Sequence, residues 1–233
     1  MSAILARIDS SKHKEIMVRI LHDIYSNKNL KDKLVFKGGT ALYLFYSLNR
    51  FSTDLNFDLL SGDENIIIKE IERIASKYGE IKNIYNKRYT IFLVISYGGI
   101  DHNIKIEINK RGISGKYEIK NLIGINILTM ALSSMTANKL IALTSRTALA
   151  NRDLYDIDYI FKNNLTVDED IIKNKTGLSI KEYYVKCLEF LNNLGDKYNI
   201  LDGMGAALDE KQKYYVKNKL LDYLKKEFAL RSL

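Results

Sequence analysis

The feature that most constrains the fold of this chain is a pair of glycines, Gly38 and Gly39, which separates a short apolar run from a helix-like segment. Glycine has no Cβ, so the backbone N–H groups of such a turn can approach an anion closely. A helix that begins at the turn adds partial positive charge at its N-terminus. The pattern predicts a strand over 33–36, a phosphate-binding turn, and a helix over 40–48.

A run of alternating polar and apolar residues follows, from Asp54 to Asp58. Successive side chains of a strand point to opposite faces, so Asp54, Asn56 and Asp58 are expected on one face, and Leu55 and Phe57 in the core. Carboxylate oxygens are ligands that Mg²⁺ prefers. Two cations held by shared carboxylates neutralise the charge that develops in phosphoryl transfer. The strand predicted over 52–60 is therefore a candidate metal-binding strand.

A further carboxylate, Glu107, lies in a second alternating run at 103–109. Isoleucines occupy one side of this run, and Lys105 and Glu107 occupy the other. Together with the β-rich run at 88–97, it predicts an antiparallel hairpin. Glu107 is a candidate metal ligand, but an exposed strand glutamate paired with Lys105 fits the same pattern.

Charged residues also cluster in the later, helical part of the chain. Lys139 and Arg146 are seven residues apart and share a helix face, while Asp153 and Asp156 are three apart and share another. A lysine and an arginine can bind a triphosphate as a point charge and as a fork. A salt-bridge network between two helices would have the same spacing, so both interpretations stay open.

Composition narrows the classes of protein. The 36 basic residues exceed the 28 acidic ones in a chain of 233 residues, for a net charge of +8. This excess favours an anionic partner such as nucleic acid, although a lysine-rich proteome gives the same balance. A single cysteine, Cys187, excludes an internal disulfide. With no apolar run of membrane-spanning length and no secretion-signal core, we expect a cytoplasmic protein without a membrane partner.

The order of predicted elements indicates an α+β fold. An N-terminal mixed-sheet domain is expected over 1–120 and a C-terminal helical domain over 121–233, with almost only helices after about residue 122. Hydrophobic periodicity predicts helices over 12–29, 64–79, 130–143, 153–162, 180–194 and 211–228.

These motifs resemble those of the AbiEii/AbiGii-type toxins, which are polymerase-β-like nucleotidyltransferases of bacterial and archaeal toxin–antitoxin systems. The resemblance covers roughly residues 30–165. It rests on Gly-Gly-Thr at 38–40, Arg-x-Ser-x-Asp-x-Asn-Phe at 50–57, Lys-x-x-Ala-Leu at 139–143, and Arg-Asp-x-x-Asp at 152–156.

The resemblance implies an enzyme that uses an NTP and Mg²⁺ or Mn²⁺ to move a nucleotidyl group to an acceptor, expected to be the 3′ end of tRNA or another RNA. It also implies a cognate antitoxin protein. By the same resemblance, the site residues fall into three groups. The catalytic residues would be Asp54, Lys139, Asp153 and Asp156. The nucleotide-binding residues would be Gly38, Gly39, Thr40, Arg50, Ser52, Lys139 and Arg146. The metal ligands would be Asp54, Asn56 and Glu107.

Asn56 departs from the family pattern, which leads one to expect Asp or Glu at this position. Asparagine can ligate through its oxygen but carries no charge. The second metal is then weaker, or Asp58 substitutes for the missing carboxylate, or this copy is impaired. Two other functions stay open: kinase-like phosphoryl transfer to a protein or small molecule, and a nucleotide-binding module without turnover.

Overall fold

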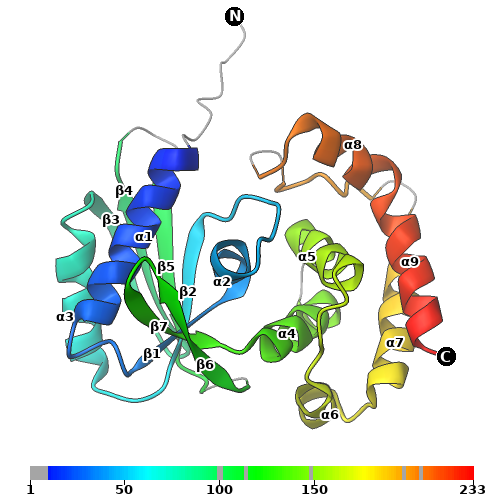
Figure 1. The fold of residues 1–233 in the computed structure, drawn as a ribbon, viewed down its shortest axis with the longest axis horizontal. Helices are drawn as coiled ribbons and strands as arrows, with labels where there is room; N and C mark the ends of the chain where they lie inside the picture. Colours follow the sequence, from blue (N-terminus) through cyan, green and yellow to red (C-terminus); the bar gives the residue numbers. More distant parts are fainter. Residues whose placement is uncertain (1–9, 99–101, 113–114, 147–148, 196–197, 205–206) are drawn as a thin grey trace, which may run out of the picture. The chain divides into compact units, whose positions relative to one another are not determined.

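The protein is described by a computed structural model covering residues 10–98, 102–112, 115–146, 149–195, 198–204 and 207–233 (Figure 1). The chain forms two compact units, each with its own core. The first, the sheet unit, contains residues 1–47 and 51–130. The second, the helical unit, contains residues 131–233 and also the short segment Leu48–Arg50, which precedes the metal-binding strand predicted above.

The sheet unit is built on a mixed sheet in the order β3-β4-β5-β2-β1-β7-β6. Its strands are β1 (Leu34–Lys37), β2 (Asp54–Leu59), β3 (Glu80–Lys87), β4 (Thr90–Ser96), β5 (Asn103–Asn109), β6 (Tyr117–Leu122) and β7 (Ile125–Met130). Strand β2 is antiparallel to β1 and parallel to β5, and β4 is antiparallel to β5. The predicted hairpin and the α+β class are therefore confirmed.

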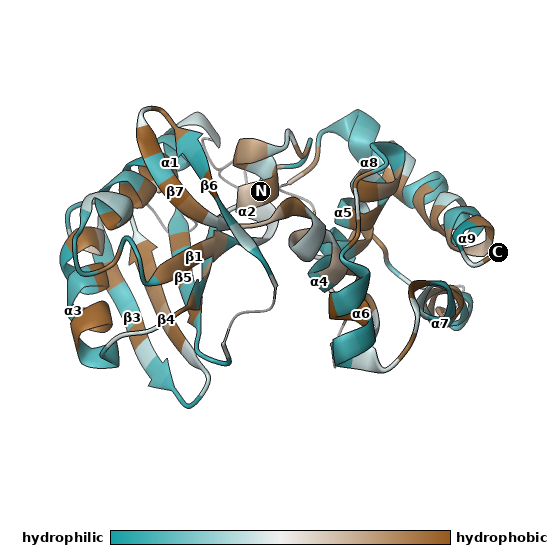
Figure 2. Ribbon diagram, turned by 60° about the horizontal axis from the view of Figure 1, so that its bottom comes forward, coloured by the Kyte–Doolittle hydropathy of each residue, from teal (hydrophilic) through white to brown (hydrophobic). Residues whose placement is uncertain are grey.

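One face of this sheet is covered by helices. Apolar side chains at alternate strand positions are buried, among them Leu55 and Phe57 of β2 and Ile106 of β5. They pack beneath α1 (Ser10–Ser26) and α3 (Glu64–Ala75), which lie side by side on that face (Figure 1). Figure 2 shows hydrophobic and hydrophilic positions alternating along the strands. The opposite face of β2 and β5 consequently carries the polar residues.

The remaining helices complete the two units. Helix α2 (Gly38–Phe45) packs against β1 and β2 of the sheet unit. The helical unit contains α4 (Leu132–Ser145), α5 (Asn151–Lys162), α6 (Glu169–Thr176), α7 (Ile180–Asn192), α8 (Glu210–Asn218) and α9 (Leu220–Arg231). Their apolar faces share a core in which Phe161, Tyr184 and Phe228 form mutual aromatic contacts.

The structure differs from the sequence-based expectation in two places. The sheet unit continues to Met130 and not to residue 120, because residues 117–130 form the hairpin β6–β7, which was not predicted. The hairpin turns at Ile123 and Gly124, which both have positive φ. The single helix expected over 211–228 is two helices, since Lys219 leaves helical geometry at φ −136°.

No helix among the described residues is both long and apolar enough to cross a membrane.

Candidate active site

The Gly-Gly turn lies where β1 ends and α2 begins. Gly38 adopts φ +83°, a left-handed conformation that favours glycine. A Cβ placed there would lie 3.4 Å from the side chain of Asn56, so the turn packs directly against the middle of β2. Lys37, the N-cap residue, provides no side-chain cap for α2. The N–H groups of the first helical turn are thus suited to bind an anion.

Thr40 and Ser52 fix the start of β2. The Thr40 hydroxyl lies 2.5 Å from the carbonyl oxygen of Asp54 and 2.9 Å from the hydroxyl of Ser52. Because a carbonyl can only accept, Thr40 donates to Asp54 and accepts from Ser52. Both side chains are buried. A phosphate contact from Thr40 would therefore come from its backbone N–H.

Strands β2 and β5 bring the predicted metal ligands onto one face. In the parallel register, Asn56 is opposite Glu107 and Asp54 is opposite Lys105, with the strands about 4.8 Å apart. One carboxylate oxygen of Asp54 accepts from the Thr53 hydroxyl at 3.3 Å. Within the described part of the chain, the side chains of Asn56 and Glu107 make no hydrogen bond or ion pair. These two groups are consequently available to a ligand.

Asp58 lies on the same face but is already engaged. Its Oδ1 accepts from Lys37 Nζ at 2.6 Å and from Asn109 Nδ2 at 2.7 Å. The carboxylate is fully buried, and its Oδ2 has no hydrogen-bond partner among the described residues. Since the Lys37 ammonium already balances its charge, Asp58 is a poor substitute for the acid that is absent at Asn56. Lys37, for its part, uses its ammonium group to bind the Asp58 carboxylate.

The donor set determines which metal site this face can form. The described residues contain no group of three His, Cys, Asp or Glu side chains that could hold a metal ion. The predicted ligands on this face supply the carboxylates of Asp54 and Glu107 and the amide of Asn56. Mg²⁺ is usually bound through one or two carboxylates together with water and substrate phosphates. The residues therefore fit one Mg²⁺ shared with a triphosphate better than a pair.

In the helical unit, the predicted charged cluster forms one continuous network. Arg50 donates to Asp156 through Nε at 2.6 Å and through Nη2 at 2.8 Å. Lys139 Nζ lies 2.7 Å from Asp156 Oδ2 and 2.8 Å from Asp153 Oδ1. Arg146 Nη2 lies 3.3 Å from Asp153 Oδ2. Three cations, from the segment Leu48–Arg50, from α4 and from the residue that follows α4, thus share two carboxylates of α5.

Burial separates the members of this network. Asp153 and Asp156 are fully buried and Arg50 is 3% exposed, whereas Lys139 and Arg146 are 14% and 44% exposed. Arg50, named above as a nucleotide-binding candidate, has a carboxylate as its partner. Burial disfavours the Asp156 carboxylate, but Lys139 and Arg50 outweigh it and hold the pKa of Asp156 below its ordinary value. Only Lys139 and Arg146 are accessible to a bound phosphate.

The ion pairs of Asp156 give the helical unit a pH-dependent stability of defined sign. A carboxylate whose folded-state pKa is lowered contributes stability above its unfolded pKa, here about 3.9, and loses it as pH falls through the folded value. We expect the urea midpoint of the wild type to exceed that of Asp156→Asn by a constant amount between pH 5 and 7. The difference should shrink below about pH 4. A difference that grows in acid would contradict this assignment.

His13 makes structural contacts in the sheet unit that were not predicted from the sequence. Its side chain is fully buried. Its Nε2 donates to the carbonyl of Thr53 at 3.1 Å, and its Nδ1 lies 2.6 Å from the hydroxyl of Tyr97. Burial lowers the pKa of His13. Its position one helical turn before the buried Met17 is the sequence signal for this inward orientation.

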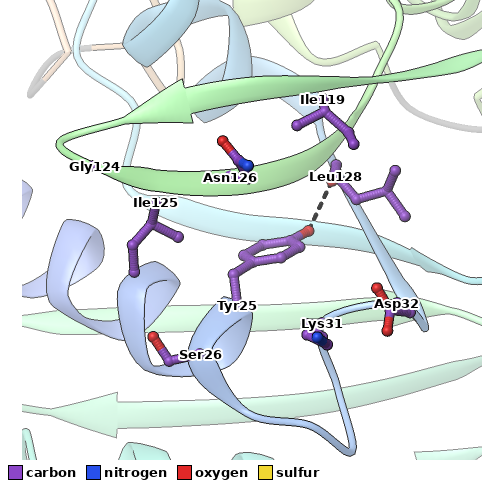
Figure 3. A pocket seen from close by; sticks show the side chains of 9 residues that line it. All are labelled: Tyr25, Ser26, Lys31, Asp32, Ile119, Gly124, Ile125, Asn126 and Leu128. Carbon is purple, nitrogen blue, oxygen red and sulfur yellow. Dashed lines mark hydrogen bonds between the residues drawn. The ribbon is translucent and has the colours of Figure 1, made fainter.

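Two cavities of the sheet unit lie at the end of α1, and neither is part of the candidate active site. One, of about 380 Å³, is lined by Tyr25 and by parts of the β6–β7 hairpin (Figure 3). There the Tyr25 hydroxyl donates to the carbonyl of Leu128 at 2.8 Å. The other, of about 350 Å³, is lined by residues of α1 and α3. Neither cavity contains a predicted site residue.

A mixed sheet with a Gly-Gly turn, an adjacent acidic strand face and a following helical unit defines a nucleotidyltransferase-like fold, and two solved structures share it. A "putative nucleotidyltransferase" from Helicobacter pylori matches with a TM-score of 0.57 at 19% identity, covering 99% of this chain and 98% of that one. The protein JHP933 from Helicobacter pylori matches with a TM-score of 0.55 at 20% identity, covering 96% and 94%.

The family comparison identifies the chain more closely. Residues 19–189 match the family described as "Nucleotidyl transferase AbiEii toxin, Type IV TA system". The match spans most of the chain, which therefore belongs to this family of nucleotidyltransferase toxins of toxin–antitoxin systems. The search of curated proteins finds no match.

Proposed function

We propose that this protein is a metal-dependent nucleotidyltransferase that moves a nucleotidyl group from an NTP to the 3′ end of an RNA, with tRNA as the expected acceptor. The observation that carries the proposal is the in-register pair of Asn56 and Glu107 beside Asp54, packed against the glycine turn of α2. Family membership supports the reaction class. The net charge of +8 supports an anionic acceptor.

In this reaction the acceptor hydroxyl oxygen forms a bond to the α-phosphorus of the NTP. The bond between the α-phosphorus and the oxygen that bridges the α- and β-phosphates breaks, and pyrophosphate leaves. The hydroxyl proton is lost to solvent. The N–H groups of Gly38, Gly39 and Thr40 would donate to phosphate oxygens. Asp54 and Glu107, with the amide oxygen of Asn56, would hold Mg²⁺, which when bound neutralises charge on the triphosphate. We assign further phosphate binding to Lys139 and Arg146, the accessible cations of their network.

The proposal is tested with purified protein, Mg²⁺, total tRNA and proteins of a cell extract, with each NTP labelled in turn at the α- or γ-phosphate. We expect label from the α-position to enter RNA. Label that moves only from the γ-position would replace the proposal with kinase-like phosphoryl transfer to a protein or small molecule. Bound nucleotide without transfer of either label would identify a binding module without turnover.

The substitution Asn56→Asp tests the role of the missing acid. A third negative ligand, added to Asp54 and Glu107, should raise Mg²⁺ affinity, so we expect the Mg²⁺ concentration for half-maximal transfer to fall about tenfold. Asn126→Asp, on the exposed side of β7, is the matched control and should change nothing. A large gain in rate at saturating Mg²⁺ would identify the present chain as an impaired copy. An unchanged Mg²⁺ requirement would show that position 56 does not contact the metal.

A further inference from the structure

A row of side chains continues from the candidate site across the open face of the sheet. Asn56 is opposite Glu107, Glu107 is opposite Phe92 of β4, and Phe92 is opposite Tyr85 of β3. Residues paired in this way point to the same face. At about 4.8 Å per strand, Phe92 lies about 5 Å and Tyr85 about 10 Å beyond Glu107, measured along the sheet. The pair of Asn56 and Glu107 thus continues directly into two aromatic side chains.

The two rings form an accessible surface. The rings of Tyr85 and Phe92 are nearly parallel, with centroids 6.2 Å apart and planes 23° apart. Tyr85 is 46% exposed, and Phe92 is partly exposed. The strand neighbours of Phe92, Ile91 and Leu93, point the other way and are buried on the face that α1 and α3 cover. A sheet face that presents aromatic rings can stack two or three unpaired bases.

Basic side chains border the same surface. Lys105, opposite Asp54, is exposed, and Lys87 Nζ lies 5.6 Å from the Tyr85 ring centroid. At the end of the β3–β4 hairpin, the guanidinium groups of Arg88 and Arg111 lie 5.0 and 4.7 Å from the ring centroid of Tyr89. Within the described ranges none of these four cations makes an ion pair. Their charge is therefore available to a polyanion.

We propose that this row is the docking surface of the acceptor, and that the acceptor is the single-stranded 3′ end of an RNA. This inference rests on the proposed function. The terminal hydroxyl would lie at Asn56 and Glu107, and the preceding bases would stack on Phe92 and Tyr85. Lys87 and Lys105 would contact the phosphates. Stacking needs exposed base faces, which a duplex does not offer, and an acidic protein would use the cations but leave the rings without partners.

The test measures RNA binding separately from turnover. A 5′-fluorescein single-stranded RNA of 12 nucleotides is titrated with the full-length chain by fluorescence anisotropy, without NTP. The variant is Tyr85→Leu with Phe92→Leu, which removes both rings but keeps apolar side chains in the strands. We expect at least about tenfold weaker binding with an unchanged salt dependence, because no phosphate contact is lost. Tyr117→Leu, a tyrosine with 51% exposure on the opposite edge strand β6, should bind like the wild type.

The outcomes separate this inference from the proposed function. Wild-type protein that does not bind the RNA, binds a blunt duplex equally well, or binds the RNA as tightly as the double variant does would overturn the docking surface. So would α-label that enters protein and not RNA. Transfer of α-label to RNA with an unchanged KM for RNA in the double variant would overturn only the surface. Ring-dependent RNA binding without transfer of α-label would overturn only the transferase.

Discussion

Asp54→Ala should reduce transfer of the α-phosphate label by at least about a thousandfold, because a metal-bound carboxylate supplies several kcal/mol of charge stabilisation. Asp54 begins β2 beside the unpartnered groups of Asn56 and Glu107, so no neighbouring acid of the face replaces it. Growth inhibition by the expressed protein should be lost together with the activity. Both are measured against the wild type at equal protein level.

The fold should survive this substitution. The hydrogen bond that ties Thr40 to position 54 uses the backbone carbonyl, which alanine retains. We expect the melting temperature to change little, and Asp32→Ala, in the exposed loop before β1, is the matched control. Full activity or undiminished growth inhibition in a well-folded Asp54→Ala protein would show that the proposed mechanism is wrong.

Asp156→Ala should lower the free energy of unfolding of the helical unit by about 3–5 kcal/mol, more than any other single substitution proposed for this protein. The substitution leaves the guanidinium of Arg50, only 3% exposed, without the carboxylate that receives two of its N–H groups. It also removes one of the two partners of Lys139. Urea unfolding followed by circular dichroism measures the effect. Asp222→Ala, at an exposed position of α9, should cost at most a few tenths of a kcal/mol.

A second variant distinguishes a structural role from a catalytic one. Replacing both buried partners, Arg50→Met with Asp156→Leu, removes the charges together and should recover most of the lost stability. If this stable variant still transfers the label, Asp156 acts only in the fold. If it is stable but inactive, the ion pair or its members contribute to the reaction. A double variant that is no more stable than Asp156→Ala would contradict the pairing.

The sequence-based predictions are accurate where a feature depends on residues close together in the sequence, and they fail where it does not. Local alternation predicted β2, β4 and β5, and their register places Asn56 opposite Glu107. The β6–β7 hairpin was missed because its turn contains Ile123, an isoleucine with positive φ, which no turn preference would suggest. The break at Lys219 likewise lacks a proline or glycine.

The candidate site was predictable only as far as its residues are close in sequence. Lys139 and Asp153 lie on consecutive helices, and their contact was among the stated alternatives. Arg50 and its partner Asp156 are 106 residues apart, so spacing could not show that a carboxylate binds the guanidinium expected to bind nucleotide. The contact of His13 with Thr53 spans 40 residues and had no local signal for its partner.

The three residues Leu48–Arg50 make the helical unit discontinuous in sequence, and this has a consequence for how the chain matures. During synthesis from the N-terminus, Arg50 leaves the ribosome long before Asp156 exists. Its guanidinium must stay hydrated until α5 has been translated, because burying it alone would cost too much. The buried ion pair can therefore close only after most of the chain has been made. A nascent chain that stops before Asp156 lacks the carboxylate of this ion pair. A fragment that begins at residue 131 lacks Arg50, the other member of the pair.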